Sequence, residues 1–155
     1  MASPAGGDRM LLKGLEEEVY VGSRDGDIAP LSHQIAADLS GFVTDPDSRN
    51  VEYTTPPLRS YEEMLDRLMT QRARLRRYIQ ELGDYTLIPG STLSLVDSDE
   101  FVISNPNNPY YQFIRDTYGT TVVTASTHIN IGIQDPERLI AAYRLLRAEA
   151  SMYLA

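Results

Sequence analysis

The clearest pattern of hydrophobic and polar positions lies near the start of the chain, at residues 14–21. Alternate residues of an extended strand point to opposite faces, so Leu15, Val19 and Val21 would share one face, with Glu17 as the odd charge on it. The opposite face would carry Gly14, Glu16, Glu18 and Tyr20. A helix would also accommodate the leucines here, but the Val-Tyr-Val ending and the turn-forming sequence after it favour a strand over about residues 11–21.

Further segments have the pattern of strands. Residues 41–49 read as a strand edge entering a turn, and residues 50–55 alternate strictly before two prolines end the pattern. Residues 85–88 and 92–95 read as one strand interrupted by a turn or bulge. The longest candidate is 120–133, which would have an apolar and a polar face. The apolar face would carry Ala125, Thr127, Ile129, Ile131 and Ile133, and the polar face Thr124, Ser126, His128, Asn130 and Gly132.

The best-defined helix is predicted from Ser60 to Leu82. Ser60 and Glu63 have the spacing of a capping box, and Gly83 stands where a C-terminal cap belongs. Its buried stripe would consist of Met64, Leu65, Leu68, Leu75, Ile79 and Leu82. The arginines of this helix suggest either phosphate binding or a solvated face, and we favour the solvated face.

Capping residues predict three other helices. A short helix would run from Ser32 to Leu39 with Ser32 as its N-cap. A second helix would begin at Asn108-Pro109, after a polar loop, and end at Gly119. The last would begin at Asp135-Pro136, with a buried stripe formed by Leu139, Tyr143, Leu146, Ala150 and Tyr153. Because this helix continues apolar to the last residue, we expect the chain to be the front part of something longer.

Composition narrows the class of protein. The chain has 155 residues, a length typical of one domain, and its first 10 residues lack an apolar core and are expected to form a disordered tail. The net charge of −8 argues against a nucleic-acid binder. There is no cysteine, which excludes disulfides, thiol nucleophiles and cysteine-ligated zinc. No apolar run of about 18 residues is present, so no membrane helix is expected and the predicted location is cytoplasmic.

The candidate chemistry lies on the polar faces of three strands. Glu16 and Glu18 would lie roughly 7 Å apart on one face and repel each other, which favours a cation between or near them. Glu52 and the pair His128 and Asn130 occupy the polar faces of two other strands. If these strands share a sheet, they form a carboxylate-rich site for a hard divalent ion. Motifs for phosphate-binding loops and dinucleotide binding are missing, and a serine-based triad is poorly supported because neither histidine has a suitable context.

Four motifs together resemble the glutamate–cysteine ligase family, and the cyanobacterial type within the carboxylate–amine ligase superfamily is the nearest. They are Gly-x-Glu-x-Glu at 14–18, Arg-Asn-Val-Glu-Tyr-Thr-Thr-Pro-Pro at 49–57, Pro-Gly-Ser-Thr-Leu-Ser at 89–94 and Thr-His-Ile-Asn-Ile-Gly at 127–132. The resemblance covers about 11–155 in the family's order. It implies an α+β fold, with a curved, mostly antiparallel sheet backed by helices, similar to the catalytic domain of glutamine synthetase. This chain would supply the N-terminal part of that domain.

The resemblance implies an ATP-dependent ligation. The γ-carboxylate of glutamate would attack the γ-phosphate of ATP, and the amine of cysteine would then displace phosphate to give γ-glutamylcysteine, the first step toward glutathione. Mg²⁺ or Mn²⁺ would neutralise the phosphates. By motif position, the metal ligands would be Glu16, Glu18 and Glu52, with His128 as a ligand or phosphate contact. Asp45 is a further candidate ligand with Asp47 as its competitor, a choice that the sequence leaves open. Asn130 is the candidate cofactor-binding residue, and Tyr20 would flank the same face.

Two other functions stay open at this point. The chain could belong to a ligase that uses another amine, or it could be a non-catalytic metal- or nucleotide-binding subunit. The expected partners are glutamate, cysteine and ATP, with a second copy of the chain or a longer chain as macromolecular partner. Neither nucleic acid nor membrane is expected.

Overall fold

A single long strand, β1 (Leu12–Ser23), organises the fold. The computed structural model describes residues 11–92 and 101–153, and within them β1 pairs with three other strands. The strand predicted over about 11–21 is confirmed. The expected tail at 1–10 and the strand residues predicted at 93–95 lie outside the described residues. Thr92 forms an isolated antiparallel bridge with Thr124.

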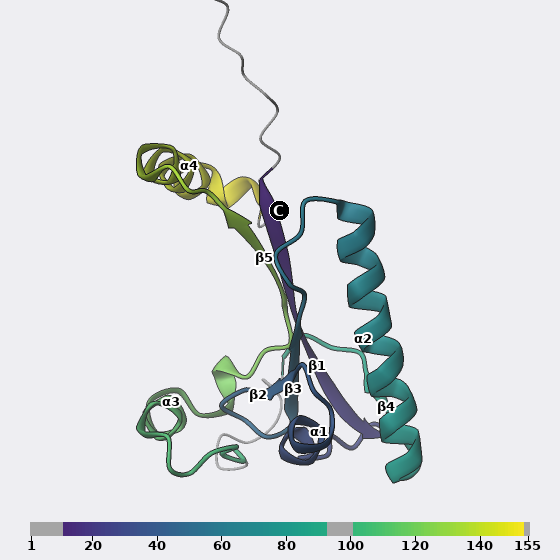
Figure 1. The fold of residues 1–155 in the computed structure, drawn as a ribbon. Coiled ribbons are helices and arrows are strands. Elements are labelled where there is room, and N and C mark those ends of the chain that lie inside the picture. The colour runs from purple at the N-terminus through teal and green to yellow at the C-terminus, as the bar shows by residue number, and fades with distance from the viewer. Residues whose placement is uncertain (1–10, 93–100, 154–155) are drawn as a thin grey trace, which may run out of the picture.

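The sheet is antiparallel throughout, as predicted. Its order is β2 (Phe42–Thr44), β3 (Asn50–Thr54), β1 and β4 (Tyr85–Ile88). The remaining strand, β5 (Thr127–Gly132), also pairs with β1. β3 lies along one side of β1, whereas β5 and β4 pair with the first and last parts of β1 respectively. Because of this arrangement, the middle of β1 lies between β3 and β5 (Figure 1).

One face of the sheet packs against α2 (Tyr61–Leu82), which stands alongside β1 in Figure 1. Ser60 caps this helix, accepting a hydrogen bond from the backbone N–H of Glu63 at 3.3 Å, as predicted. The principal core lies between α2, the short helix α1 (Ser32–Asp38) and the sheet. Its buried residues are Val19, Val21, Ile35, Phe42, Val51, Tyr53, Leu75 and Ile79. The apolar positions of β1 and β3 therefore face α2, as their alternation predicts.

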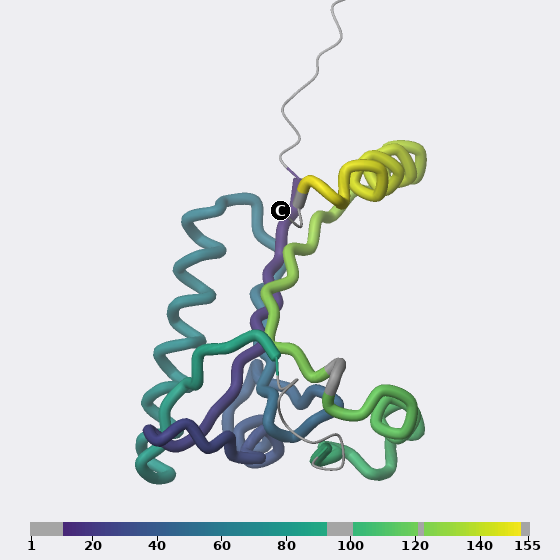
Figure 2. Tube along the Cα trace, turned by 180° about the vertical axis from the view of Figure 1, so that it is seen from behind, coloured from purple at the N-terminus to yellow at the C-terminus, as the bar shows by residue number. Residues whose placement is uncertain are grey.

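The other face carries a smaller core around Tyr20, Phe101 and Val123. The helix α3 (Pro109–Tyr118) contributes Ile114 to this core. As predicted, Asn108 caps α3, accepting from the backbone N–H of Tyr110 at 3.0 Å, and Gly119 follows the last helical residue with a φ of 57°. α2 and α3 thus lie on opposite sides of the sheet, as Figure 2 shows from behind.

Three local predictions were wrong. Ser32 is the first residue of α1 and Leu31 is its N-cap, with no side-chain capping bond. Leu65 is exposed because α2 turns it away from the sheet, although Met64, Leu75 and Ile79 are buried. The strand predicted over 120–133 begins only at Thr127, because the chain first forms the 3-10 helix η2 (Gly119–Val122), closed by a bond from Val123 N–H to Thr120 O at 3.0 Å.

The predicted burial of the last helix was also wrong. α4 (Pro136–Glu149) begins as expected, with Asp135 accepting from the N–H groups of Glu137 and Arg138 at 2.9 and 3.2 Å. A short 3-10 helix, η3 (Ala150–Tyr153), follows it. However, Leu139, Tyr143 and Leu146 are exposed, since α4 projects from the end of β5 away from α2 (Figures 1 and 2).

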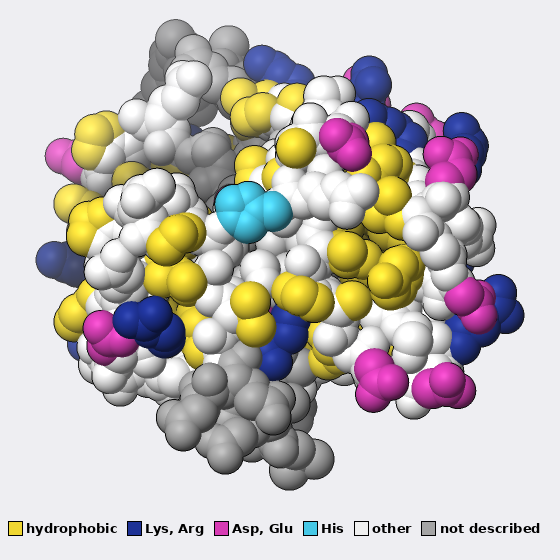
Figure 3. Space-filling model, turned by 90° about the horizontal axis from the view of Figure 1, so that it is seen from below, with side chains coloured by type: hydrophobic (Ala, Val, Ile, Leu, Met, Phe, Trp, Pro, Cys, Tyr) yellow, Lys and Arg dark blue, Asp and Glu magenta, His cyan; other side chains and the backbone are white. Residues whose placement is uncertain are grey.

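The molecular surface has both signs of charge. Figure 3 views the end of the molecule that lies lowest in Figure 1, and acidic and basic side chains are interspersed around the rim of this face, with hydrophobic side chains between them. No helix in the described part of the chain is long and apolar enough to cross a lipid bilayer.

Candidate metal centre

Three carboxylates from neighbouring strands converge on the face of the sheet opposite α2. Glu18 of β1 stands directly across from Glu52 of β3, and Asp45 follows β2 at the next position in the sheet. Carboxylate oxygens of these three residues all lie within 4.8 Å of one another. Oxygen ligands of one Mg²⁺ ion, each at about 2.1 Å from it, are separated by roughly 3–4 Å. A hard divalent cation would therefore fit this donor set with small side-chain movements.

A second polar group adjoins the three carboxylates along β1. Glu16 stands across from His128 of β5. Its two oxygens meet His128 Nδ1 at 2.9 Å and the Asn130 amide, which donates at 2.7 Å. His128 Nε2 lies 3.8 Å from Glu18 Oε1, which joins this group to the carboxylate cluster. The structure thus brings together the candidate residues Glu16, Glu18, Glu52, His128 and Asn130 with Asp45, which the sequence had left in competition with Asp47.

Burial and neighbouring negative charges together raise the pKa values of Asp45 and Glu52 in the cluster. Burial, followed by the charge of Glu18, raises the pKa of Asp45 to about 7. Burial and then the charges of Glu16 and Glu18 raise the pKa of Glu52. The hydrogen bond between Glu16 and His128 works in the other direction, lowering the pKa of Glu16 and raising that of His128. A cation at the cluster would relieve the repulsion that disfavours ionised Asp45 and Glu52.

The geometry distinguishes Asp45 from Asp47, which the sequence left open. Asp47 is fully buried and accepts hydrogen bonds from Arg49 Nε and Nη2 at 2.9 and 2.6 Å. It also accepts from the backbone N–H groups of Arg49 and Val102. This carboxylate is therefore committed to an internal ion pair that joins the turn to the loop at 102, whereas Asp45 lies with Glu18 and Glu52.

Asn50 holds Asp45 in place and was not singled out from the sequence. Its side-chain amide donates to Asp45 Oδ2 at 3.0 Å and to the backbone carbonyl of Thr124 at 2.7 Å. Asn50 is completely buried and stands two residues before Glu52, on the same face of β3. Alternation along β3 was the signal that could have identified it, because Asn50 is a polar residue on the same face as Glu52.

Tyr20 flanks the carboxylates, as the sequence suggested, on the same face of β1 as Glu18. It is buried in the smaller core and its hydroxyl donates to the backbone carbonyl of Val123 at 2.8 Å. Burial raises its pKa. Tyr20 therefore has a packing role beside the cluster, and its hydroxyl proton is committed to the hydrogen bond with Val123.

Glu17, the odd charge on the apolar face of β1, is explained by α2. Arg72 of α2 donates to Glu17 Oε1 at 3.0 Å, and the Thr127 hydroxyl donates to Oε2 at 2.8 Å. The predicted solvated arginine face of α2 is therefore wrong for Arg72, which joins the helix to the sheet.

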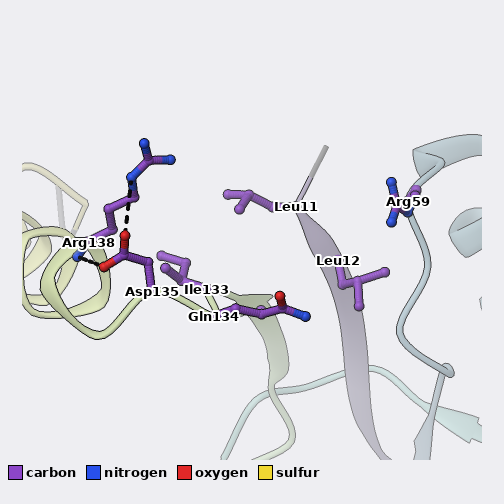
Figure 4. A pocket seen from close by; sticks show the side chains of 8 residues that line it. Leu11, Leu12, Arg59, Ile133, Gln134, Asp135 and Arg138 are labelled. Atoms are coloured by element: carbon purple, nitrogen blue, oxygen red, sulfur yellow. Dashed lines mark hydrogen bonds and ion pairs between the residues drawn. The ribbon is translucent and has the colours of Figure 1, made fainter. Parts of the chain in front are cut away.

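A hollow of about 280 Å³ lies toward the start of β1 (Figure 4). Its lining includes Leu11 and Leu12, with Arg59 on one side and Asp135 and Arg138 on the other. Leu12 shares the face of Glu16 four residues away, which is roughly 13 Å along a strand. The hollow is thus separate from the carboxylate cluster along the same strand.

The chain was compared with curated proteins and with protein families. No curated protein matches the chain. The family described as Glutamate-cysteine ligase family 2 (GCS2) matches residues 12–155, from the first residue of β1 onward. The matched range contains every residue of the carboxylate cluster and of the group around His128. The chain therefore belongs to glutamate–cysteine ligase family 2.

Proposed function

We propose that the chain serves the ATP-dependent joining of the γ-carboxylate of glutamate to the amine of cysteine, through an acyl phosphate. The observation that carries this proposal is the convergence of Glu18, Asp45 and Glu52 on one sheet face. In a chain of this ligase family, such a carboxylate set suits Mg²⁺ or Mn²⁺. Other acidic clusters occur without a metal, but this one adds half-buried, mutually repelling carboxylates to family membership.

The residues of the site would take different roles. Glu18, Asp45 and Glu52 would hold the divalent cation, which when bound would neutralise phosphate charge as two anions approach each other. His128, held by Glu16, would contact a phosphate group of the substrate; its side chain is half exposed and so accessible to a substrate. Asn130, anchored on the other oxygen of Glu16, would contact the nucleotide.

The test is ADP release by the full chain with Mg²⁺, ATP, glutamate and cysteine. We expect release that requires both amino acids and falls at least tenfold in Glu52→Gln, since the loss of one ligand weakens metal binding. Glu62→Gln, which alters an exposed carboxylate of α2, is the matched control and should release ADP as the wild type does. Replacing cysteine with other amines tests the choice of amine substrate.

A second candidate function is a metal- or nucleotide-binding subunit without turnover. It is favoured by the exposure of β5, all six residues of which are accessible beside the cluster. Mn²⁺ binding that depends on Glu52, without ADP release under any amine, would support this second function over the ligase. ADP release without dependence on Glu52 would contradict the metal assignment in both.

A further inference from the structure

We propose that Ser126 is a positioning residue that orients Glu18 for a divalent cation. This inference rests on the metal centre of the proposed function. The Ser126 hydroxyl donates to Glu18 Oε2 at 2.9 Å, and the backbone N–H of Ser126 donates to the same oxygen at 3.0 Å. Two donors from one residue thus fix one oxygen of a carboxylate whose side chain is only 10% exposed.

A backbone hydrogen bond to β1 fixes the position of Ser126. Ser126 directly precedes β5, and its carbonyl accepts a hydrogen bond from the backbone N–H of Glu18 at 2.9 Å. The pair therefore continues the register in which His128 faces Glu16. Since both Ser126 donors bind Oε2, the other oxygen of Glu18 is left to turn toward the cation. An oriented carboxylate loses less conformational freedom when it binds a metal, and residues that orient ligands in this way strengthen metal binding.

Ser126, His128 and Glu16 are arranged like a serine–histidine–carboxylate triad. In a catalytic triad, however, the serine hydroxyl donates to the histidine, whereas here it donates to Glu18. Ser126 Oγ is 2.9 Å from His128 Nε2, and His128 Nδ1 is 2.9 Å from Glu16. A hydroxyl has one proton, and an ionised carboxylate can only accept. With that proton on Glu18, His128 must donate to Ser126, so it cannot act as the base that activates the hydroxyl. The contacts therefore support positioning and argue against a nucleophile.

Thr127 provides a matched control one residue away. Its hydroxyl donates to Glu17 Oε2 at 2.8 Å on the opposite face of the sheet. Thr127→Val and Ser126→Ala each remove one hydroxyl-to-glutamate hydrogen bond at the start of β5. Only Ser126→Ala removes a bond to a member of the carboxylate cluster.

The experiment measures Mn²⁺ affinity of the full chain from the electron paramagnetic resonance signal of free Mn²⁺. We expect Ser126→Ala to weaken binding about tenfold, Ser126→Thr to retain most of the affinity, and Thr127→Val to leave it unchanged. Circular dichroism and urea unfolding establish that each variant folds. A purely structural role would lower stability in both variants without separating their Mn²⁺ affinities.

The outcomes separate this inference from the proposed function. Ser126→Ala with wild-type affinity, beside a Glu18→Gln variant that has lost it, would overturn the role of Ser126 and leave the metal centre standing. Equal binding by the wild type and Glu18→Gln, or no binding by either, would overturn both. Covalent labelling of Ser126 by a serine-directed fluorophosphonate would overturn positioning in favour of a nucleophile.

Discussion

At the scale of single residues, Asp45 and Asp47 lie two positions apart but have different environments. Asp47 is fully buried in its pair with Arg49, so Asp47→Asn breaks a buried ion pair. Breaking a buried pair costs about 3 kcal/mol in the free energy of unfolding. Asp45→Asn should instead maintain or raise stability, because it removes a charge that Glu18 and Glu52 repel, while weakening Mn²⁺ binding at least tenfold. Urea unfolding and Mn²⁺ titration of both variants check this, and reversed effects would contradict it.

The raised pKa of Asp45 predicts a pH dependence. In the folded chain the pKa is about 7, against an ordinary value of 3.8. Between these values the folded state holds a proton that the unfolded state has lost, so this group lowers the free energy of unfolding as pH rises through that window. Mn²⁺ must displace the same proton, and its affinity should rise with pH until about pH 7.

Comparison of the wild type with Asp45→Asn isolates this effect. Glu52 and His128 also have raised pKa values, so they contribute a dependence of the same sign in both proteins. Urea unfolding across pH 4 to 8 should show a steeper fall in the wild type than in the variant. Equal slopes would indicate that Asp45 has an ordinary pKa.

Residue patterns could predict which side chains share the face of the cluster but not every member of it. Alternation along β1, β3 and β5 placed Glu16, Glu18, Glu52, His128 and Asn130 on one side, and the structure agrees. Asp45 and Asp47 follow β2 in a turn, where alternation no longer applies. What distinguishes them is the ion pair of Asp47 with Arg49 and the hydrogen bond that Asp47 accepts from Val102, and the second of these contacts joins residues far apart in the sequence.

At the scale of the elements, tertiary contacts can override the secondary structure that the local sequence pattern predicts. The segment from Thr120 alternates like a strand, yet the structure gives it a 3-10 turn that brings Val123 to Tyr20 and Thr124 to Asn50. Local pattern could not anticipate these two contacts. Helix boundaries were predicted better, because caps such as Ser60, Asn108 and Asp135 act through neighbouring backbone groups.

The attachment of α2 to β1 predicts a measurable coupling. Arg72, 35% exposed, pairs with Glu17, which is 12% exposed. Arg72→Met should lower the free energy of unfolding by about 1–2 kcal/mol, because among the described residues it leaves the mostly buried Glu17 carboxylate with Thr127 alone as side-chain donor. Urea unfolding in a double-mutant cycle with Glu17→Gln should give a coupling of about 1 kcal/mol. Mn²⁺ affinity should stay unchanged in every variant, and zero coupling would show that the pair contributes nothing.

At the scale of the whole molecule, apolar surface is unevenly covered. α2 runs alongside β1, whereas α3 lies at the lower end of the sheet on the opposite side, and β5 and α4 extend beyond α3 (Figures 1 and 2). Ile129 is 66% exposed and Tyr143 is 60% exposed, although the sequence predicted apolar faces there. Periodicity identifies an apolar face correctly in such cases, but it cannot show whether any element packs against it.

This exposure predicts self-association of the chain as it exists here. The exposed apolar side chains of β5 and α4 form a group and are not scattered singly over the surface. In the described structure an unpaired edge of β5 adjoins them. Sedimentation velocity should show larger species as protein concentration rises. Because the association is apolar, sulfate should strengthen it, whereas a charge-driven association would weaken with added salt.

Leu139→Gln combined with Leu146→Gln should shift the chain toward monomer with little loss of stability, since both side chains are already exposed. A wild type that sediments as a monomer at every concentration would contradict the prediction.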